Sequence, residues 1–254
     1  MCPTVENDGF LSRLTLLTGI EAAGALKKCR VIVFGLGGVG SWAAEALVRS
    51  GVGNISLVDS DRVAASNINR QVEAKCSTIG RLKTEALEER LKDINPSCKI
   101  KTYPNVFSKE SSGIFGIAEL DYVIDAIDTL TYKLDLIETS LAAGKPLFSS
   151  MGMAQKLDPT LIKTADIWDT RGCPLARLVR QGLRKRGISG HFTAVYSPEQ
   201  IPRLDTLPYE RGDAGWDSGK KVINGSVVTV TATAGMVLAS LVIRDLCARF
   251  GGAL

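Results

Sequence analysis

The chain has 254 residues, of which 45% are hydrophobic and 23% charged, and its formal net charge is +4. This composition is typical of a folded globular protein and excludes a chain that is disordered throughout. The modest net charge says little about partners, so the distribution of charge along the chain carries more information.

The cysteines and the first residues bear on location. No two cysteines form a CxxC pair, which argues against structural zinc and favours a reduced, cytoplasmic protein. Residues 1–10 lack an apolar core, so we expect no secretion signal. The six cysteines are Cys2, Cys29, Cys76, Cys98, Cys173 and Cys247.

Strands and helices alternate through the first two thirds of the chain. Short apolar runs predict strands, and longer periodic segments that end at Gly or Asn-Pro predict helices. This alternation predicts an α/β fold with a doubly wound, mostly parallel sheet of the Rossmann-like type. We expect strands at 31–34, 54–59, 99–103, 122–126 and 146–150, and helices at 41–51, 85–94 and 132–143.

The last third predicts a C-terminal α+β extension. Two strands are expected at 161–165 and 192–196, with a basic helix at 175–185 between them. A loop rich in Pro, Gly and Asp follows at 198–221, and a long helix at 228–250 closes the chain. The apolar run in that helix has 17 residues, which is short for a membrane span, so we expect a core or dimer-interface helix.

These segments predict one domain over residues 1–254. We expect a nucleotide-binding core at 10–165. Residues 166–254 would then bind the substrate and form the dimer.

A glycine-rich loop follows the first strand. Gly35, Gly37, Gly38 and Gly40 lie between a strand and the start of a helix, where the backbone can approach phosphates closely. Asp59 ends the next strand, a position suited to a carboxylate that binds ribose hydroxyls. This pair of features does not distinguish a dinucleotide from ATP.

Three charged residues favour ATP. Arg70, Lys83 and Asp128 are expected beyond strand ends, on the side where the ligand would lie. Arginine and lysine can neutralise phosphates, and an aspartate at a strand end can hold Mg²⁺. Taken alone, Arg70 or Lys83 is more often an ordinary surface charge; together with the glycine loop they favour a triphosphate site.

Four spaced motifs resemble the ATP site of the ubiquitin-activating superfamily, which includes the sulfur-carrier adenylyltransferases. They are GLGGVGSWAAEAL, LVDSDRVAASNINRQ, GRLKTE and DAIDT. The resemblance implies an ATP-dependent, ligase-type enzyme that adenylates a carboxylate.

The resemblance also implies residue roles. Gly38 would contact phosphates, Asp59 the ribose, and Asp128 would bind Mg²⁺. Arg13 would reach the ATP of the partner subunit in a homodimer. Further residues implied at the nucleotide and its triphosphate are Asp61, Asn67, Asn69, Arg70 and Lys83.

Within this superfamily the chain is similar to the tRNA threonylcarbamoyladenosine dehydratases. The similarity rests on the segments VGSWAAEAL, MGMAQKLDPT, CPLARLVRQGLRKRG and VTATAG, and on the lack of CxxC pairs. It implies that the threonine carboxylate of a modified adenosine beside the tRNA anticodon is adenylated. The neighbouring carbamoyl group would then attack, AMP would leave, and a cyclic base would result.

The basic helix at 175–185 supports a tRNA partner. Residues 170–198 contain six cations and no acid: Arg171, Arg177, Arg180, Arg184, Lys185 and Arg186. Helical spacing predicts a buried face of Leu175, Leu178, Val179, Gly182 and Leu183. The cations would then contact phosphates of the anticodon arm, although a merely solvated face is the alternative.

Other interpretations remain open. A sulfur-carrier adenylyltransferase without zinc would bind a protein with a flexible C-terminal tail, and a sulfur-transfer protein could also dock on the dehydratase. An NAD-dependent oxidoreductase and a non-catalytic tRNA-binding protein are further alternatives. His191, the only histidine, is expected to be structural, and the proposed cyclisation needs no thiol from Cys173.

Overall fold

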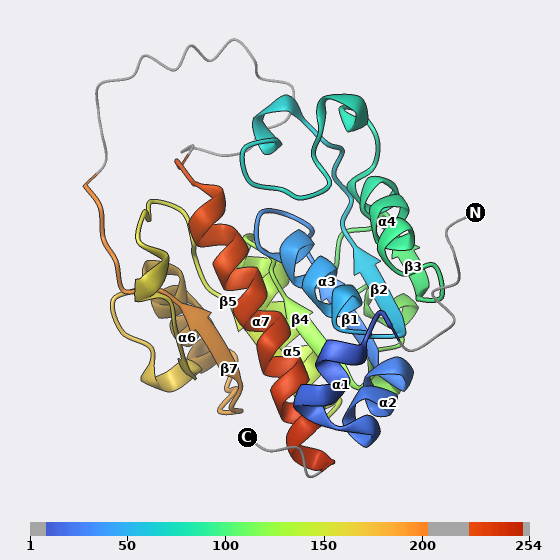
Figure 1. Ribbon diagram of the computed structural model, residues 1–254. Coiled ribbons are helices and arrows are strands. Elements are labelled where there is room, and N and C mark those ends of the chain that lie inside the picture. Colours follow the sequence, from blue (N-terminus) through green and yellow to red (C-terminus); the bar gives the residue numbers. More distant parts are fainter. Residues whose placement is uncertain (1–8, 203–223, 251–254) are drawn as a thin grey trace.

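The computed structural model describes residues 9–202 and 224–250. Its centre is a seven-stranded sheet with the strand order β3-β2-β1-β4-β5-β7-β6 (Figure 1). All neighbouring strands are parallel except β6, which runs antiparallel to β7 at one edge. The bounds are β1 Arg30–Phe34, β2 Asn54–Val58, β3 Lys99–Tyr103, β4 Tyr122–Asp125, β5 Leu147–Ser150, β6 Lys163–Asp166 and β7 Thr193–Tyr196.

The burial of the strands follows from their positions in the sheet. Every residue of the central strands β4 and β5 is buried, whereas the edge strand β3 has no buried residue. A parallel strand covered on both faces is mostly apolar, as in the buried residues VIVF of β1 and YVI of β4. The doubly wound, mostly parallel fold predicted from the sequence is therefore confirmed.

Two helical layers cover the sheet. The core on one face includes side chains of α3 (Gly40–Arg49), α4 (Lys83–Ile94) and α7 (Val228–Arg249). The core on the other face includes side chains of α5 (Leu130–Ala142) and α6 (Pro174–Lys185). The C-terminal extension continues the same sheet, since β7 pairs with β5. The functional division at residues 165/166 stays a prediction.

The long final helix is α7, which lies across one face of the sheet (Figure 1). Its buried side chains, among them Val230, Leu238 and Val242, belong to the core beneath it. Within the described residues, α7 is long and apolar enough to cross a membrane, but half of its most apolar window is buried in the protein. This packing supports the interpretation of α7 as a core helix.

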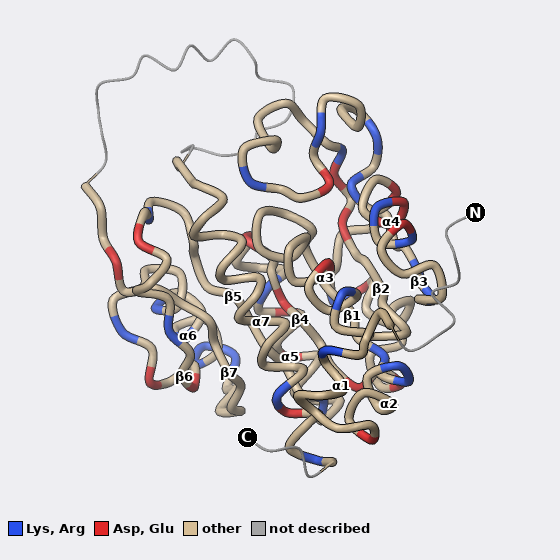
Figure 2. Tube along the Cα trace, in the orientation of Figure 1, with Lys and Arg blue, Asp and Glu red and all other residues tan. Residues whose placement is uncertain are grey.

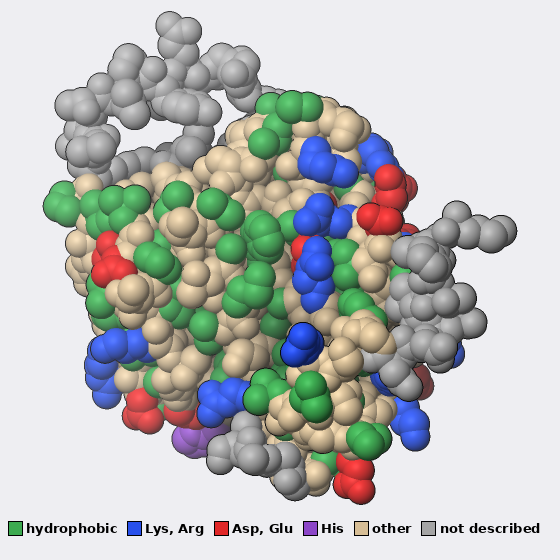
Figure 3. All heavy atoms as spheres, viewed as in Figure 1, with side chains coloured by type: hydrophobic (Ala, Val, Ile, Leu, Met, Phe, Trp, Pro, Cys, Tyr) green, Lys and Arg blue, Asp and Glu red, His purple; other side chains and the backbone are tan. Residues whose placement is uncertain are grey.

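Two short helices precede the sheet and were not predicted. They are α1 (Ser12–Thr18) and α2 (Ile20–Lys28), and Gly19 joins them with a φ of 84°. Leu16, Leu17 and Ile20 are 76–81% exposed, which leaves apolar side chains on the surface. Figure 3 shows hydrophobic side chains gathered on this part of the surface and along α7.

Most other elements agree with prediction. The helix predicted from residue 85 begins two residues earlier, so that Lys83 is the first residue of α4. Of the loop predicted at 198–221, residues 203–221 lie outside the described part of the chain.

Candidate functional site

The glycine loop between β1 and α3 is folded tightly against the end of β4. The backbone N–H of Gly35 donates to the carbonyl oxygen of Val58 at 2.9 Å, and Gly35 has a φ of 84°. A Cβ at Gly35 would lie 2.7 Å from the Ala126 carbonyl oxygen, and one at Gly40 only 1.8 Å from the Gly35 carbonyl oxygen. Both positions therefore require glycine.

Asp59 connects this loop to the end of β2. Its Oδ2 accepts a hydrogen bond of 2.7 Å from the backbone N–H of Leu36, inside the glycine loop. Its Oδ1 accepts one of 2.8 Å from the N–H of Asp61. The carboxylate predicted to bind ribose is therefore fixed by the loop predicted to bind phosphates.

Lys83 is buried beside these acids. Its Nζ lies 2.9 Å from Asp61 Oδ2 and 3.8 Å from Asp59 Oδ2. Burial alone would lower the pKa of Lys83, but the two carboxylates outweigh it and raise that pKa above its ordinary value. Lys83 is therefore a positive charge fixed next to the glycine loop.

The segment 65–71 closes the same site from a different direction. A Cβ at Gly38 would lie 3.2 Å from Arg70 Cγ and 3.1 Å from Thr231 Oγ1, so Arg70 and α7 both border the loop. The Arg70 guanidinium donates to the carbonyl oxygen of Ser66 and to Asn69 Oδ1, each at 2.9 Å.

The two asparagines of this segment have structural partners. Asn67 is buried, and its Oδ1 accepts from the backbone N–H of Ala64 at 3.0 Å. Asn69 Nδ2 donates to the carbonyl oxygen of Ser226, just before α7, at 2.9 Å. These contacts hold the segment in shape; a direct contact of either asparagine with the nucleotide stays a prediction.

The DAIDT motif contains two different aspartates. Asp125 is fully buried and accepts bonds of 2.6 Å from Lys133 Nζ and from Ser149 Oγ, so it is part of the core. Asp128 is exposed in the loop after β4, the strand next to β1. No cluster of three or more potential metal ligands occurs in the described residues, so Asp128 could hold Mg²⁺ only if phosphate oxygens of the nucleotide supplied further ligands.

Arg13 lies far from this loop within its own chain. It is an exposed residue of α1, and neighbouring Leu11 packs where a Cβ at Gly51 would lie, beyond the C-terminal end of α3. The glycine loop precedes the other end of that ten-residue helix. A helix of this length spans about 15 Å, so Arg13 and the loop lie at opposite ends of α3.

Three buried polar side chains near the loop were missed by the sequence analysis. In the described residues, the buried side-chain atoms without a hydrogen-bond partner are Gln71 Oε1, both oxygens of Glu73, and Thr84 Oγ1. Gln71 and Glu73 follow Arg70 in the chain, and Thr84 follows Lys83. Such orphaned atoms are rare in folded proteins and mark sites completed by water or ligand. The glycine cradle and the orphaned oxygen of Gln71, whose Nε2 lies 3.9 Å from where a Cβ at Gly37 would be, fit a bound nucleotide.

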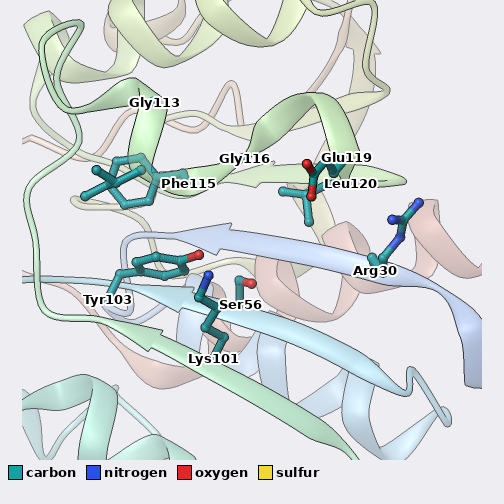
Figure 4. A pocket seen from close by; sticks show the side chains of 10 residues that line it. Arg30, Ser56, Lys101, Tyr103, Gly113, Phe115, Gly116, Glu119 and Leu120 are labelled. Carbon is teal, nitrogen blue, oxygen red and sulfur yellow. The ribbon is translucent and has the colours of Figure 1, made fainter.

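Hollows elsewhere on the surface do not coincide with this site. One of about 210 Å³ lies over β2 and β3, where Lys101 Nζ sits 4.8 Å from the centre of the Tyr103 ring (Figure 4). Arg30 and Glu119 lie toward its other end. It contains none of the residues predicted at the nucleotide, so we place the site at the glycine loop.

The cations of α6 are less uniform than the sequence suggested, although they run along this helix (Figure 2). Arg186 is bound to Asp135 at 2.7 Å and Glu138 at 2.9 Å, so α5 neutralises it. Arg184 stacks over Trp168, and Arg180 donates to Thr170 Oγ1. Exposed Arg177 and Lys185 are better placed for phosphates.

The apolar face of α6 was predicted with one error. Val179 and Leu183 are buried as expected, but Leu178 is 42% exposed, so its predicted burial is wrong. The buried residues of α6 are Ala176, Val179 and Leu183. The buried face of the helix therefore runs through Ala176 and not through Leu178.

Cys173 and His191 take no visible part in the nucleotide site. Cys173 is a buried free thiol at the N-cap of α6. His191 pairs with Asp166 through Nδ1 at 3.0 Å, on the edge strand β6.

Comparison with known proteins identifies the family. The ThiF family model matches residues 11–249. The tRNA threonylcarbamoyladenosine dehydratase of Bacillus subtilis is 42% identical over 92% of this chain and 93% of its own length. The Escherichia coli enzyme of the same name is 31% identical over 92% of this chain and 91% of its length.

Solved structures agree. The crystal structure of the Escherichia coli tRNA N6-threonylcarbamoyladenosine dehydratase in complex with ATP superposes with a TM-score of 0.83, at 30% identity and 96% coverage of both chains. A Candida glabrata adenylyltransferase and sulfurtransferase is 35% identical, but over only 61% of this chain and 36% of its own. The chain therefore belongs to the ThiF family and, within it, to the tRNA threonylcarbamoyladenosine dehydratases.

Proposed function

We propose that this protein uses ATP to dehydrate, and thereby cyclise, threonylcarbamoyladenosine in tRNA. The observation that carries the proposal is the group of Asp59, Asp61 and Lys83 fixed against a glycine loop at the start of α3. Backbone N–H groups at a helix start and a buried lysine supply the positive charge that a triphosphate needs. The family relationship then supplies the identity of the carboxylate.

The reaction would proceed in two steps. The threonine carboxylate attacks the α-phosphorus of ATP, and pyrophosphate leaves. The carbamoyl group of the same nucleoside then attacks the activated carbonyl, and AMP leaves as the ring closes. No thiol is needed, in agreement with the buried position of Cys173.

The residues of this chain would divide the work of binding. The loop of Gly35, Gly37, Gly38 and Gly40 would leave room for the phosphates, and Asp59 would accept hydrogen bonds from the ribose. Lys83 and Arg70 would neutralise triphosphate charge, because Lys83 is already a fixed cation and Arg70 borders Gly38.

A magnesium ion fits the loop after β4. Mg²⁺ commonly takes one or two carboxylates together with phosphate oxygens, and Asp128 is an exposed carboxylate in that loop. When bound, the ion would neutralise charge on the departing pyrophosphate. Asp128 would hold the ion on the protein side.

A homodimer would explain the position of Arg13. This residue lies at the far end of α3 from its own glycine loop, so it would serve the loop of a partner. Leu16, Leu17 and Ile20 expose apolar surface on the same pair of helices, and Met236 of α7 is 43% exposed. A second copy covering these side chains would remove them from water.

The decisive experiment is mass analysis of nucleosides from tRNA incubated with the protein and ATP. The proposal requires ATP-dependent loss of one water from threonylcarbamoyladenosine, together with release of AMP and pyrophosphate. If the nucleoside keeps its mass while a sulfur-carrier tail is adenylated instead, the protein is a carrier adenylyltransferase.

A further inference from the structure

Glu73 is a buried acid without an evident partner. Its side chain is fully buried, yet neither carboxylate oxygen has a hydrogen-bond partner among the described residues. An ionised carboxylate in this state would cost several kcal/mol of desolvation. Its backbone, in contrast, is well held, because the Glu73 carbonyl oxygen accepts from Thr78 Oγ1 at 2.8 Å.

Two cations on α4 lie near enough to influence Glu73, but both are bound to other acids. Lys83 forms ion pairs with Asp61 and Asp59, as described above. Lys83 and Glu73 interact electrostatically, and each shifts the pKa of the other. Arg90 also interacts electrostatically with Glu73, but its guanidinium is bound to Glu45 of α3 at 2.5 Å. Neither cation is therefore paired with Glu73.

The remaining polar neighbour is also committed. Ser41, in the first turn of α3, donates from Oγ to the carbonyl oxygen of Gly37 at 2.7 Å, and its Oγ accepts from the N–H of Val72 at 3.3 Å. The same serine thus links the glycine loop to the segment that carries Glu73. The acid therefore follows directly on a residue bound to the start of α3, and it lies within electrostatic reach of Lys83, the first residue of α4.

Burial decides the charge of this acid. It raises the pKa of Glu73 to about 8. Its own backbone N–H, the positive charge of Lys83 and the nearby Ser41 hydroxyl oppose the rise, and the negative charge of Asp59 adds to it. At pH 7 the carboxyl group is therefore mostly protonated and neutral. With Glu73 neutral, the charge of Lys83 is balanced by two carboxylates, Asp59 and Asp61, rather than by three.

We propose that Glu73 is a positioning residue that must be uncharged for ATP to bind, because an ionised Glu73 would compete with the triphosphate for the charge of Lys83. The inference rests on the proposed ATP site. It adds that ATP binding has an upper pH limit, set by the ionisation of an acid that does not touch the nucleotide. Binding of a highly charged anion nearby would in turn favour the protonated form of Glu73.

The test compares the KM for ATP at pH 7 and pH 9 in a pyrophosphate-release assay. In the native protein the KM should rise about tenfold between these values, since one pH unit above a pKa of about 8 ionises most of the acid. In Glu73→Gln, which cannot ionise, the ratio should fall to about one, while kcat changes with pH alike in both proteins. Equal ratios in native protein and variant would overturn the proposal.

A matched control separates this effect from the loss of any acid near Lys83. Glu85 is exposed on α4, two residues after Lys83. Glu85→Gln should keep the native tenfold ratio. If Glu85→Gln abolishes the ratio as well, Glu73 has no special role.

A measurement on the native protein alone covers the case in which Glu73→Gln does not fold. Calorimetry of ATP binding at pH 8.5, in two buffers with different ionisation enthalpies, reports the protons taken up. We expect uptake of roughly half a proton or more, because Glu73 must be reprotonated; no uptake would overturn the inference. If ATP does not bind even at pH 7, the proposed function itself fails. That result differs from ATP binding with proton uptake and from ATP binding without it.

Discussion

The backbone N–H of Leu36 and the Oδ2 of Asp59 are joined by a hydrogen bond of 2.7 Å, which fixes the glycine loop to the end of β2. The second oxygen of Asp59 is occupied by the N–H of Asp61. Both donors are backbone groups that cannot reverse their roles. The nucleotide loop is therefore held in shape by a carboxylate with two acceptor oxygens.

Asp59→Asn should weaken ATP binding by about 10- to 100-fold, because one of the two N–H donors would face an NH₂ group instead of an acceptor, and bonds to charged groups contribute about 1.5–3 kcal/mol. Calorimetry with ATP measures the loss. Ser60→Ala, a change at the exposed neighbouring residue, is the control and should bind ATP normally. Affinity within twofold of native in Asp59→Asn would mean that the carboxylate is not the anchor.

Mixing two inactive proteins should test the shared active site. Arg13→Ala and Asp128→Ala are each expected to lose turnover, the first through the partner's site and the second through its own. Hybrid dimers contain one site in which both residues are intact, so tRNA-dependent AMP release should return to roughly a quarter of native activity. If activity does not return although mass spectrometry demonstrates subunit exchange, Arg13 does not act in the active site of the partner subunit.

Exposed cations on α6 should contribute to tRNA binding. The double variant Arg177→Ala/Lys185→Ala should weaken tRNA affinity and flatten its salt dependence by roughly one to two units of slope. ATP binding should stay normal because neither residue borders the glycine loop. Lys27→Ala/Lys28→Ala removes the same charge from exposed positions of α2 and should leave both the affinity and the slope nearly unchanged. Equal effects of the two double variants would show only that overall charge matters.

Cys173 occupies the N-cap of α6 without making a side-chain capping bond. Serine has nearly the same shape and caps helices well, so Cys173→Ser should stabilise the fold by about 1 kcal/mol. In a chain of this size that corresponds to an increase in Tm of about 2–4 °C. Cys76→Ser, at an exposed cysteine, should leave Tm unchanged. A lower Tm for Cys173→Ser would show that the buried thiol packs better than a hydroxyl caps.

The sequence was most informative where a residue type is required by backbone geometry. Gly35 and Gly40 cannot carry a Cβ, and the residues YVI of β4 are mostly apolar because helices cover both faces of the sheet. These constraints are local, so a pattern reveals them.

Features that depend on distant partners could not be predicted. Nothing in DAIDT indicates that its first aspartate is neutralised by Lys133 eight residues later while the second is exposed. The partners of Arg186 lie on α5, about fifty residues earlier, so this arginine was counted with the phosphate-binding cations. Glu73 was missed because an acid in a short loop resembles any solvated residue until the folded chain buries it.

The contact between α7 and the glycine loop has a consequence for how the protein is made. A Cβ at Gly235 would lie 2.5 Å from the Val39 carbonyl oxygen, so the backbones of α7 and α3 touch at this point. Four residues earlier, Thr231 borders Gly38. One wall of the nucleotide loop is thus supplied by a segment that leaves the ribosome long after the loop itself. A nascent chain that has already completed β1, α3 and β2 still lacks that wall, and we expect it not to bind cellular ATP until α7 has been made and has packed against α3.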